Sequence, residues 1–145
     1  MFRIERHDGP IDQIALHDDS AGSFAMLAPS RGGMATRMHV GGDEVFFLDQ
    51  DSFLAVPKNV RGGNPVLFPT PGKLIDDSWS RDGHGGTLKQ HGFGRNAAWS
   101  ITEESTSDGA SVTLGLTSDD STRANYPWDF DTSFRYTMRG DTLRI

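Results

Sequence analysis

The sequence predicts an all-β protein, an antiparallel β-sandwich formed by a single domain over residues 1–145. Three observations lead to this class. No segment of ten or more residues keeps the 3.6-residue apolar period of a helix. Short apolar or alternating runs are instead separated by turn residues, and the chain contains 17 Gly and 7 Pro. The length of 145 residues suits one domain, and no internal repeat divides it.

The clearest strand signals lie in the first third of the chain. Residues 11–16 form a short mixed strand, and residues 23–28 form a compact apolar run. Residues 34–40 alternate apolar and polar side chains, which is typical of a half-buried strand. A Gly-Gly-Asp turn follows, so we predict a β-hairpin over residues 34–48.

Residues 53–90 differ from their surroundings. They contain four prolines, several Gly pairs and a polar stretch over 76–86, which predicts a long loop. Loops of this length are uncommon in compact domains and are often functional. We predict strands again over residues 97–103, 110–117, 131–138 and 143–145, with one helical turn within 118–126.

Composition limits the partners and the compartment. The net charge of −6 weighs against nucleic acid, and no stretch approaches the roughly 20 apolar residues that a membrane-spanning helix needs. The N-terminus lacks the apolar region of a signal peptide, and the absence of cysteine fits a reducing compartment. We therefore expect a cytoplasmic protein that binds neither nucleic acid nor membranes. A few local arginines would still suffice to bind a small anion.

The first motif with functional potential is Arg61-Gly62-Gly63-Asn64-Pro65. Its two glycines can adopt positive φ, and Pro65 restricts Asn64 to extended conformations. Such a loop brings main-chain N–H groups and the five donors of a guanidinium to a hydroxyl, carboxylate or phosphate. An ordinary Gly/Pro loop with a solvated arginine has the same pattern, so both interpretations stay open.

The second motif is Lys89-Gln90-His91-Gly92-Phe93-Gly94-Arg95, and Trp99 follows it. A histidine titrates near neutral pH and can exchange a proton with a sugar oxygen. Phe93 and Trp99 offer aromatic faces that stack on the C–H face of a pyranose. The alternative is a structural histidine at the start of a strand, with both aromatic side chains in the core.

The other histidines and the acidic residues indicate no metal site. No two histidines have an HxH or HxxxH spacing, and no acidic pair matches the spacing of a calcium loop. We interpret the acidic pairs as solvated turns.

Together with Tyr126-Pro127-Trp128-Asp129-Phe130, the two motifs resemble the aldose 1-epimerase (galactose mutarotase) superfamily, and most closely its hexose-6-phosphate branch. The resemblance implies half of a galactose-mutarotase-like supersandwich. It also implies interconversion of the α and β anomers of a hexose or hexose phosphate by general acid–base catalysis, without a cofactor. His91 would be catalytic and would contact the sugar near its reacting end. The implied substrate-binding residues are Arg61, Lys89, Arg95, Asn64, Phe93 and Trp99.

The sequence departs from this family after Phe130. The family's catalytic glutamate and second histidine lie in its C-terminal half, and nothing after Phe130 resembles either. We therefore expect an N-terminal half of the family's fold, and three hypotheses follow. The chain is a truncated epimerase that is active when the missing half is supplied, a non-catalytic carbohydrate-binding module, or a homodimer that rebuilds the sandwich. Lys89 and Arg95 beside Arg61 slightly favour a phosphorylated sugar.

Overall fold

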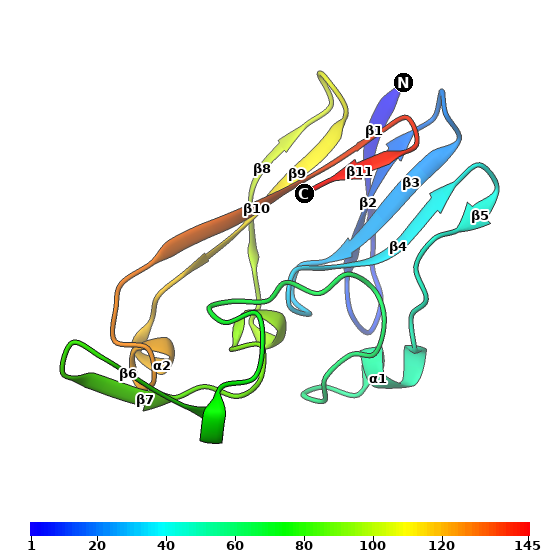
Figure 1. The fold of residues 1–145 in the computed structure, drawn as a ribbon. Coiled ribbons are helices and arrows are strands. Elements are labelled where there is room, and N and C mark those ends of the chain that lie inside the picture. The colour runs from blue at the N-terminus through cyan, green and yellow to red at the C-terminus, as the bar shows by residue number, and fades with distance from the viewer.

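The computed structural model describes residues 1–145 and contains two antiparallel sheets that pack face to face (Figure 1). The five-stranded sheet runs in chain order through Phe2–His7 (β1), Gln13–Asp18 (β2), Ser23–Ala28 (β3), Met34–Val40 (β4) and Asp43–Glu44 (β5). The four-stranded sheet has the order β11-β10-β9-β8 and consists of Ser100–Ser105 (β8), Ala110–Thr117 (β9), Asp131–Arg139 (β10) and Thr142–Arg144 (β11). The predicted antiparallel β-sandwich is confirmed.

The core lies between these sheets because alternate side chains of each strand face it. Leu16 of β2, Leu27 of β3, Leu114 of β9 and Tyr136 of β10 are all fully buried in one cluster. Burial of each such side chain contributes about 1.5–3 kcal/mol. The Tyr136 hydroxyl donates a hydrogen bond to the Gly33 carbonyl at 2.9 Å, which joins β10 to the turn that precedes β4.

Two predicted segments have a different structure. In the hairpin predicted over 34–48, the second strand is only the two residues of β5. Residues 47 and 48 instead contact the Arg61 loop, where the Gly63 N–H donates to the Phe47 carbonyl and Leu48 bridges to Gly62. The long loop predicted over 53–90 contains a hairpin of its own, Ser78–Arg81 (β6) with His84–Thr87 (β7).

Helical structure is confined to single turns. Gln50–Leu54 (α1) begins after Asp49, whose carboxylate accepts the Ser52 N–H. Asp120–Arg123 (α2), within the predicted helical turn, begins with a capping box formed by Asp119 and Thr122. Neither helix is long or apolar enough to cross a membrane.

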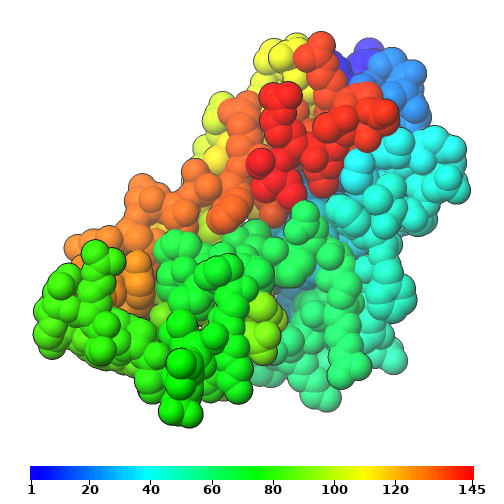
Figure 2. Space-filling view, viewed as in Figure 1, coloured from blue at the N-terminus to red at the C-terminus, as the bar shows by residue number.

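The segment that carries both motifs lies across one end of the sandwich. In the space-filling view, residues of about 60–95 form a continuous layer at the end away from the N-terminus (Figure 2). Isolated bridges attach this layer to the sheet and to itself, since Ala35 pairs with Asn64 and Phe68 pairs with Gly92. The loops are therefore held by main-chain hydrogen bonds.

Candidate functional site

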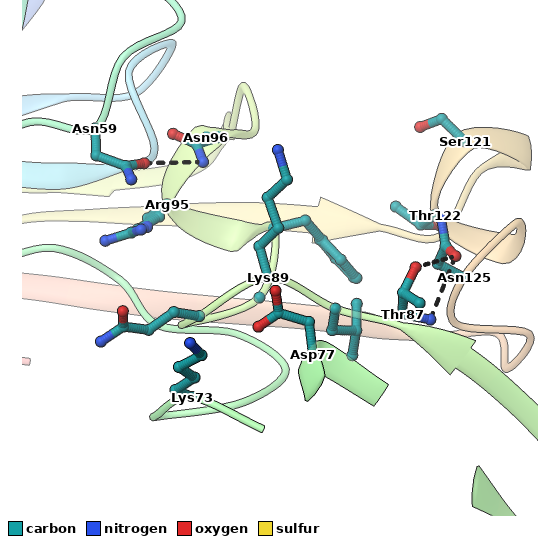
Figure 3. Close-up of a pocket in the computed structure, with 14 residues that line it drawn as sticks. Asn59, Lys73, Asp77, Thr87, Lys89, Arg95, Asn96, Ser121, Thr122 and Asn125 are labelled. Carbon is teal, nitrogen blue, oxygen red and sulfur yellow. Dashed lines mark hydrogen bonds between the residues drawn. The ribbon is translucent and has the colours of Figure 1, made fainter. Parts of the chain in front are cut away.

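An open cavity of about 520 Å³ lies in this layer, between the segment 87–96 and helix α2 (Figure 3). Three cations, Lys73, Lys89 and Arg95, and one carboxylate, Asp77, line it. The balance of these four charges is +2, although the whole chain carries −6. The cavity therefore offers a locally positive surface to a small anion.

Amides and hydroxyls line the rest of the cavity. On one side the Asn96 amide donates to the Asn59 side-chain oxygen at 3.4 Å, and on the other the Thr87 hydroxyl donates to the Asn125 side-chain oxygen at 3.2 Å (Figure 3). Lys89 lies between these two pairs. A cavity with many hydrogen-bonding groups and few apolar ones suits a sugar better than an apolar ligand.

The main-chain turn that contains Arg95 is hydrogen-bonded to the core. Arg95 lies in the 3₁₀ turn Gly94–Asn96, and the Gly94 carbonyl accepts the indole N–H of Trp99 at 2.8 Å. The Arg95 Nε is buried and has no hydrogen-bond partner. A buried donor without a partner is costly, so this nitrogen is an unfavourable feature of the protein next to the cavity.

His91 lies beside the cavity but does not line it. Its neighbours Gln90 and Gly92 do line it, and His91 itself is half-buried with a φ of 71°. The His91 Nδ1 lies 2.8 Å from the Pro71 carbonyl oxygen. Because a carbonyl only accepts, Nδ1 carries the proton and Nε2 is the acceptor of the neutral ring. This contact fixes both the orientation and the tautomer of the imidazole.

The main-chain conformation and close contacts at position 92 require glycine. Gly92 has a φ of 68°, and a Cβ added there would lie 2.3 Å from the Phe68 carbonyl oxygen. The Phe93 and Gly94 N–H groups both donate to that oxygen, at 2.9 and 2.8 Å. The chain around His91 therefore wraps closely around one carbonyl, which only glycine allows.

Arg61 lies at a neighbouring hollow of about 530 Å³, together with Asp49, Asp51 and Lys58. Asn59 lines both this hollow and the larger cavity. The Arg61 N–H donates to the Ser52 hydroxyl at 3.0 Å, which fixes the start of the motif, whereas its side chain is exposed. The two sequence motifs thus occupy adjacent hollows.

The other predicted site residues divide between cavity and framework. Phe93 lines the cavity and packs edge-on against Phe68 at 5.7 Å. Asn64 lines neither hollow, and its main chain pairs with Ala35. Trp99 is 4% exposed in the core and lines neither hollow. The structure therefore brings together Lys89, Phe93 and Arg95, and shows for Trp99 the core position that was the alternative interpretation.

Several lining residues gave no signal in the sequence. Asn59, Lys73, Asp77 and Asn125 belong to three separate segments, since only Lys73 and Asp77 are near each other in the sequence, and these segments meet only through the tertiary fold. A His–Glu cluster was missed for the same reason. No histidine spacing along the chain indicates a metal site, whereas in the fold the potential ligand atoms of Glu5, His7 and His17 of β1 and β2 lie within 4.8 Å of one another.

The profile of one protein family, described as aldose 1-epimerase, matches residues 18–145. The chain belongs to the aldose 1-epimerase family. Among solved structures, this aldose 1-epimerase chain is similar to the Slr1438 protein from Synechocystis sp. PCC 6803, with 33% identity and a TM-score of 0.87 over 96% of this chain and 49% of that one. A galactose mutarotase-like protein from Clostridium acetobutylicum, 18% identical, shares the fold with a TM-score of 0.80 over 98% of this chain and 47% of the other.

A Salmonella typhimurium relative carries the name "Putative glucose-6-phosphate 1-epimerase" and is 30% identical over 107 residues, which are 73% of this chain and 33% of that protein. A relative of the same name from Cenchrus ciliaris is 36% identical over 63 residues, 43% of this chain and 16% of that protein. The chain thus spans about half the length of its structural neighbours and a third or less of these two relatives. It corresponds to half of a galactose-mutarotase-like supersandwich.

Proposed function

We propose that this chain supplies a sugar-binding half of an aldose 1-epimerase site for a hexose 6-phosphate. The observation that carries the proposal is the cavity in which Lys89, Arg95 and Lys73 outnumber the single carboxylate Asp77. Two relatives whose names specify glucose 6-phosphate support the same substrate class. A phosphate group is a strong acceptor for ammonium and guanidinium donors, and three side chains with such groups line the cavity.

Six of the seven predicted residues have a place in this proposal, whereas Trp99 lies in the core. Lys89 and Arg95 bind the phosphate or the sugar hydroxyls in the cavity, and Phe93 offers an aromatic face to the ring. Arg61 contacts the sugar from the adjacent hollow, and the Asn64 main chain holds the Arg61 loop against β4. His91, oriented by the Pro71 carbonyl, passes a proton to or from the ring oxygen as the ring opens. The carboxylate that takes the anomeric proton belongs, by family resemblance, to the half that this chain does not span.

Calorimetric titration with glucose 6-phosphate and with glucose tests the binding step. We expect the phosphorylated sugar to bind at least about tenfold more tightly, because charge-assisted hydrogen bonds contribute about 1.5–3 kcal/mol. Lys89→Gln should remove most of this preference. Arg139→Gln is the control, since Arg139 is an exposed cation that lines neither hollow. Equal dissociation constants for the two sugars, or equal losses in both variants, would exclude a phosphate site at Lys89.

Anomer exchange measured by NMR tests the chemical step. Where exchange is faster than in buffer, His91→Asn should slow it by about a hundredfold or more, because it removes the proton-transfer group. An unchanged rate in this variant would remove His91 from the mechanism.

A non-catalytic carbohydrate-binding module is the second candidate. The observation in its favour is that the cavity has few groups that could transfer protons. His91 does not line it, and Asp77 is its one carboxylate. Saturable sugar binding with exchange no faster than in buffer would support this function over the first. The homodimer remains a prediction, and light scattering at the monomer mass of 15.9 kDa would count against it.

A further inference from the structure

A cluster of two histidines and a carboxylate lies on the face of the five-stranded sheet that points away from the core. Glu5 and His7 of β1 share this face because they are two residues apart, while the apolar residues of β1 pack toward the core. The register pairs Arg3 with His17, so His17 of β2 lies on the same face. The potential ligand atoms of Glu5, His7 and His17 all lie within 4.8 Å of one another.

We propose that Glu5, His7 and His17 form a binding site for a divalent transition-metal ion of the Zn²⁺ type. Two imidazoles and one carboxylate are a common donor set for zinc, with water in the fourth position. This site is separate from the sugar cavity, since none of its residues lines that cavity.

The distances between the side chains suit such an ion. With metal–ligand bonds of about 2.0–2.1 Å, neighbouring ligand atoms of a tetrahedral site are about 3.4 Å apart. The Glu5 carboxylate oxygens lie 3.5 Å from the His17 Nε2 and 3.9 Å from the His7 Nε2. These two separations, which are measured to different Glu5 oxygens, need to shorten by about 0.5 Å or less to reach tetrahedral spacing. All potential ligand atoms lie within 4.8 Å of one another, so the two imidazole nitrogens need to approach each other by at most about 1.4 Å.

His17 is the most firmly placed of the three ligands. Its side chain is 16% exposed, and its ring packs against Phe24 with 5.5 Å between the ring centroids. Its Nε2 is buried and has no hydrogen-bond partner, although it lies near the Glu5 carboxylate. Glu5 and His7 are more exposed and can adjust their side chains around a bound ion. A metal ion could bind this nitrogen once its proton has moved to Nδ1, and would then take the place of the missing hydrogen-bond partner.

Arg3 is the competitor for this site. Its guanidinium bonds to Glu5 and approaches the His17 Nδ1 at 3.2 Å. Arginine only donates, so this contact keeps the proton of neutral His17 on Nε2, the nitrogen that would bind the metal. Arg3 also bonds to Asp19 at 2.9 Å, so it can keep one carboxylate partner when Glu5 and His17 turn to an ion. Metal binding and the Arg3 contacts thus exclude each other in part.

Titration of the full chain with zinc chloride, followed by calorimetry, tests the proposal. We expect one ion per chain. His7→Gln and His17→Gln should each weaken binding by about tenfold or more, because loss of even an outer-shell partner costs that much at metal sites. Arg3→Gln should strengthen binding, because it removes the competing donor. Since His7 is exposed, its variant is expected to fold normally.

His39→Gln is the matched control. His39 lies on the same sheet face beyond Phe24 and also has a glutamate neighbour, Glu44, at 3.4 Å, but it lacks a third ligand. The His39→Gln variant should bind zinc with the same affinity as the unchanged protein. Equal losses in the His7, His17 and His39 variants would mean adventitious binding by surface histidines and would overturn the proposal, as would weaker binding in Arg3→Gln.

Thermal unfolding provides a second measurement. β1 is an edge strand that pairs only with β2, so an ion bound by residues of both strands should stabilise their pairing. Zinc should raise the unfolding temperature of the unchanged protein and of His39→Gln, because a ligand that binds only the folded state stabilises it. The same shift in His7→Gln would contradict the assignment.

Discussion

Replacement of Trp99 by phenylalanine separates a structural role of this side chain from a role in sugar binding. Trp99 is 4% exposed, packs edge-on against Phe134 and donates its indole N–H to the Gly94 carbonyl at 2.8 Å. Phenylalanine keeps an aromatic ring in the core but has no donor and leaves part of the volume empty. The substitution therefore affects the support of the Arg95 turn without introducing a polar or charged group.

The expected cost can be worked out from these contacts. The Gly94 carbonyl keeps a second donor, the Ala97 N–H at 3.3 Å, so the lost hydrogen bond should cost about 1 kcal/mol, the middle of the usual range. The unfilled volume adds about 1 kcal/mol. The free energy of unfolding should thus fall by about 2 kcal/mol, which for a chain of this size lowers the unfolding temperature by roughly 6–8 °C.

Scanning calorimetry and sugar titration, the latter well below the unfolding transition, provide the measurements. We expect the lower unfolding temperature together with a sugar affinity within about twofold of the unchanged protein, since an indirect effect on the folded site is worth only a few tenths of a kcal/mol. Trp128→Phe is the control at a half-buried tryptophan and should change stability by less than about 1 kcal/mol. Unchanged stability with sugar affinity reduced tenfold would refute the core role and restore Trp99 as a contact to the sugar.

Three further predictions concern the loops around the site. Gly92→Ala should cost about 2 kcal/mol or more in thermal unfolding and should weaken sugar binding, because its Cβ would lie 2.3 Å from the Phe68 carbonyl at a positive φ. Gly22→Ala, at a φ of 63° with nothing within 4 Å, should cost only about 1 kcal/mol, and equal costs would exclude the clash. Arg31 is buried and donates to three main-chain carbonyls of residues 52–58. Arg31→Met should therefore lower the free energy of unfolding, measured by urea denaturation, by about 2–4 kcal/mol. An unchanged free energy of unfolding would contradict a stabilising role for these hydrogen bonds. A serine hydroxyl and a main-chain N–H of α2 lower the pKa of Asp119 from its ordinary value near 3.8. This cap therefore stabilises α2 above that pH and is lost as the pH falls through the lower folded value. The protection of the α2 amides against exchange, relative to their intrinsic rates at each pH, should therefore fall on acidification, but not in Asp119→Asn.

The strands that could be predicted are those whose signals are local. Residues 23–28 and 110–117 have the predicted bounds, because a compact apolar run between turns specifies a strand without reference to its neighbours. β1 was missed, since only Phe2 and Ile4 among its six residues are apolar. It is a strand because it pairs with β2 along its whole length, which the sequence of β1 alone does not indicate.

The residues of the candidate site likewise include some that the sequence could predict and some that it could not. The motif around His91 identified Lys89, Phe93 and Arg95, which are close in sequence and line one cavity. It could not identify Lys73 or Asn125, because ordinary polar residues on separate segments carry no pattern. It also could not place Trp99, whose aromatic side chain suits a sugar face and a core equally well until burial is known.

The glycines of the two motifs connect the fold to the proposed function. Gly62 has a φ of 94°, and a Cβ there would lie 2.2 Å from the Phe47 carbonyl oxygen, just as a Cβ at Gly92 would lie 2.3 Å from that of Phe68. At both positions the chain passes directly against another main-chain segment immediately after Arg61 or His91. Main-chain contacts of this kind cannot relax by a change of rotamer, so they position the side chains that precede them more rigidly than side-chain packing would. The Gly residues beside Arg61 and His91 therefore support the proposed site, although neither can contact a sugar through a side chain.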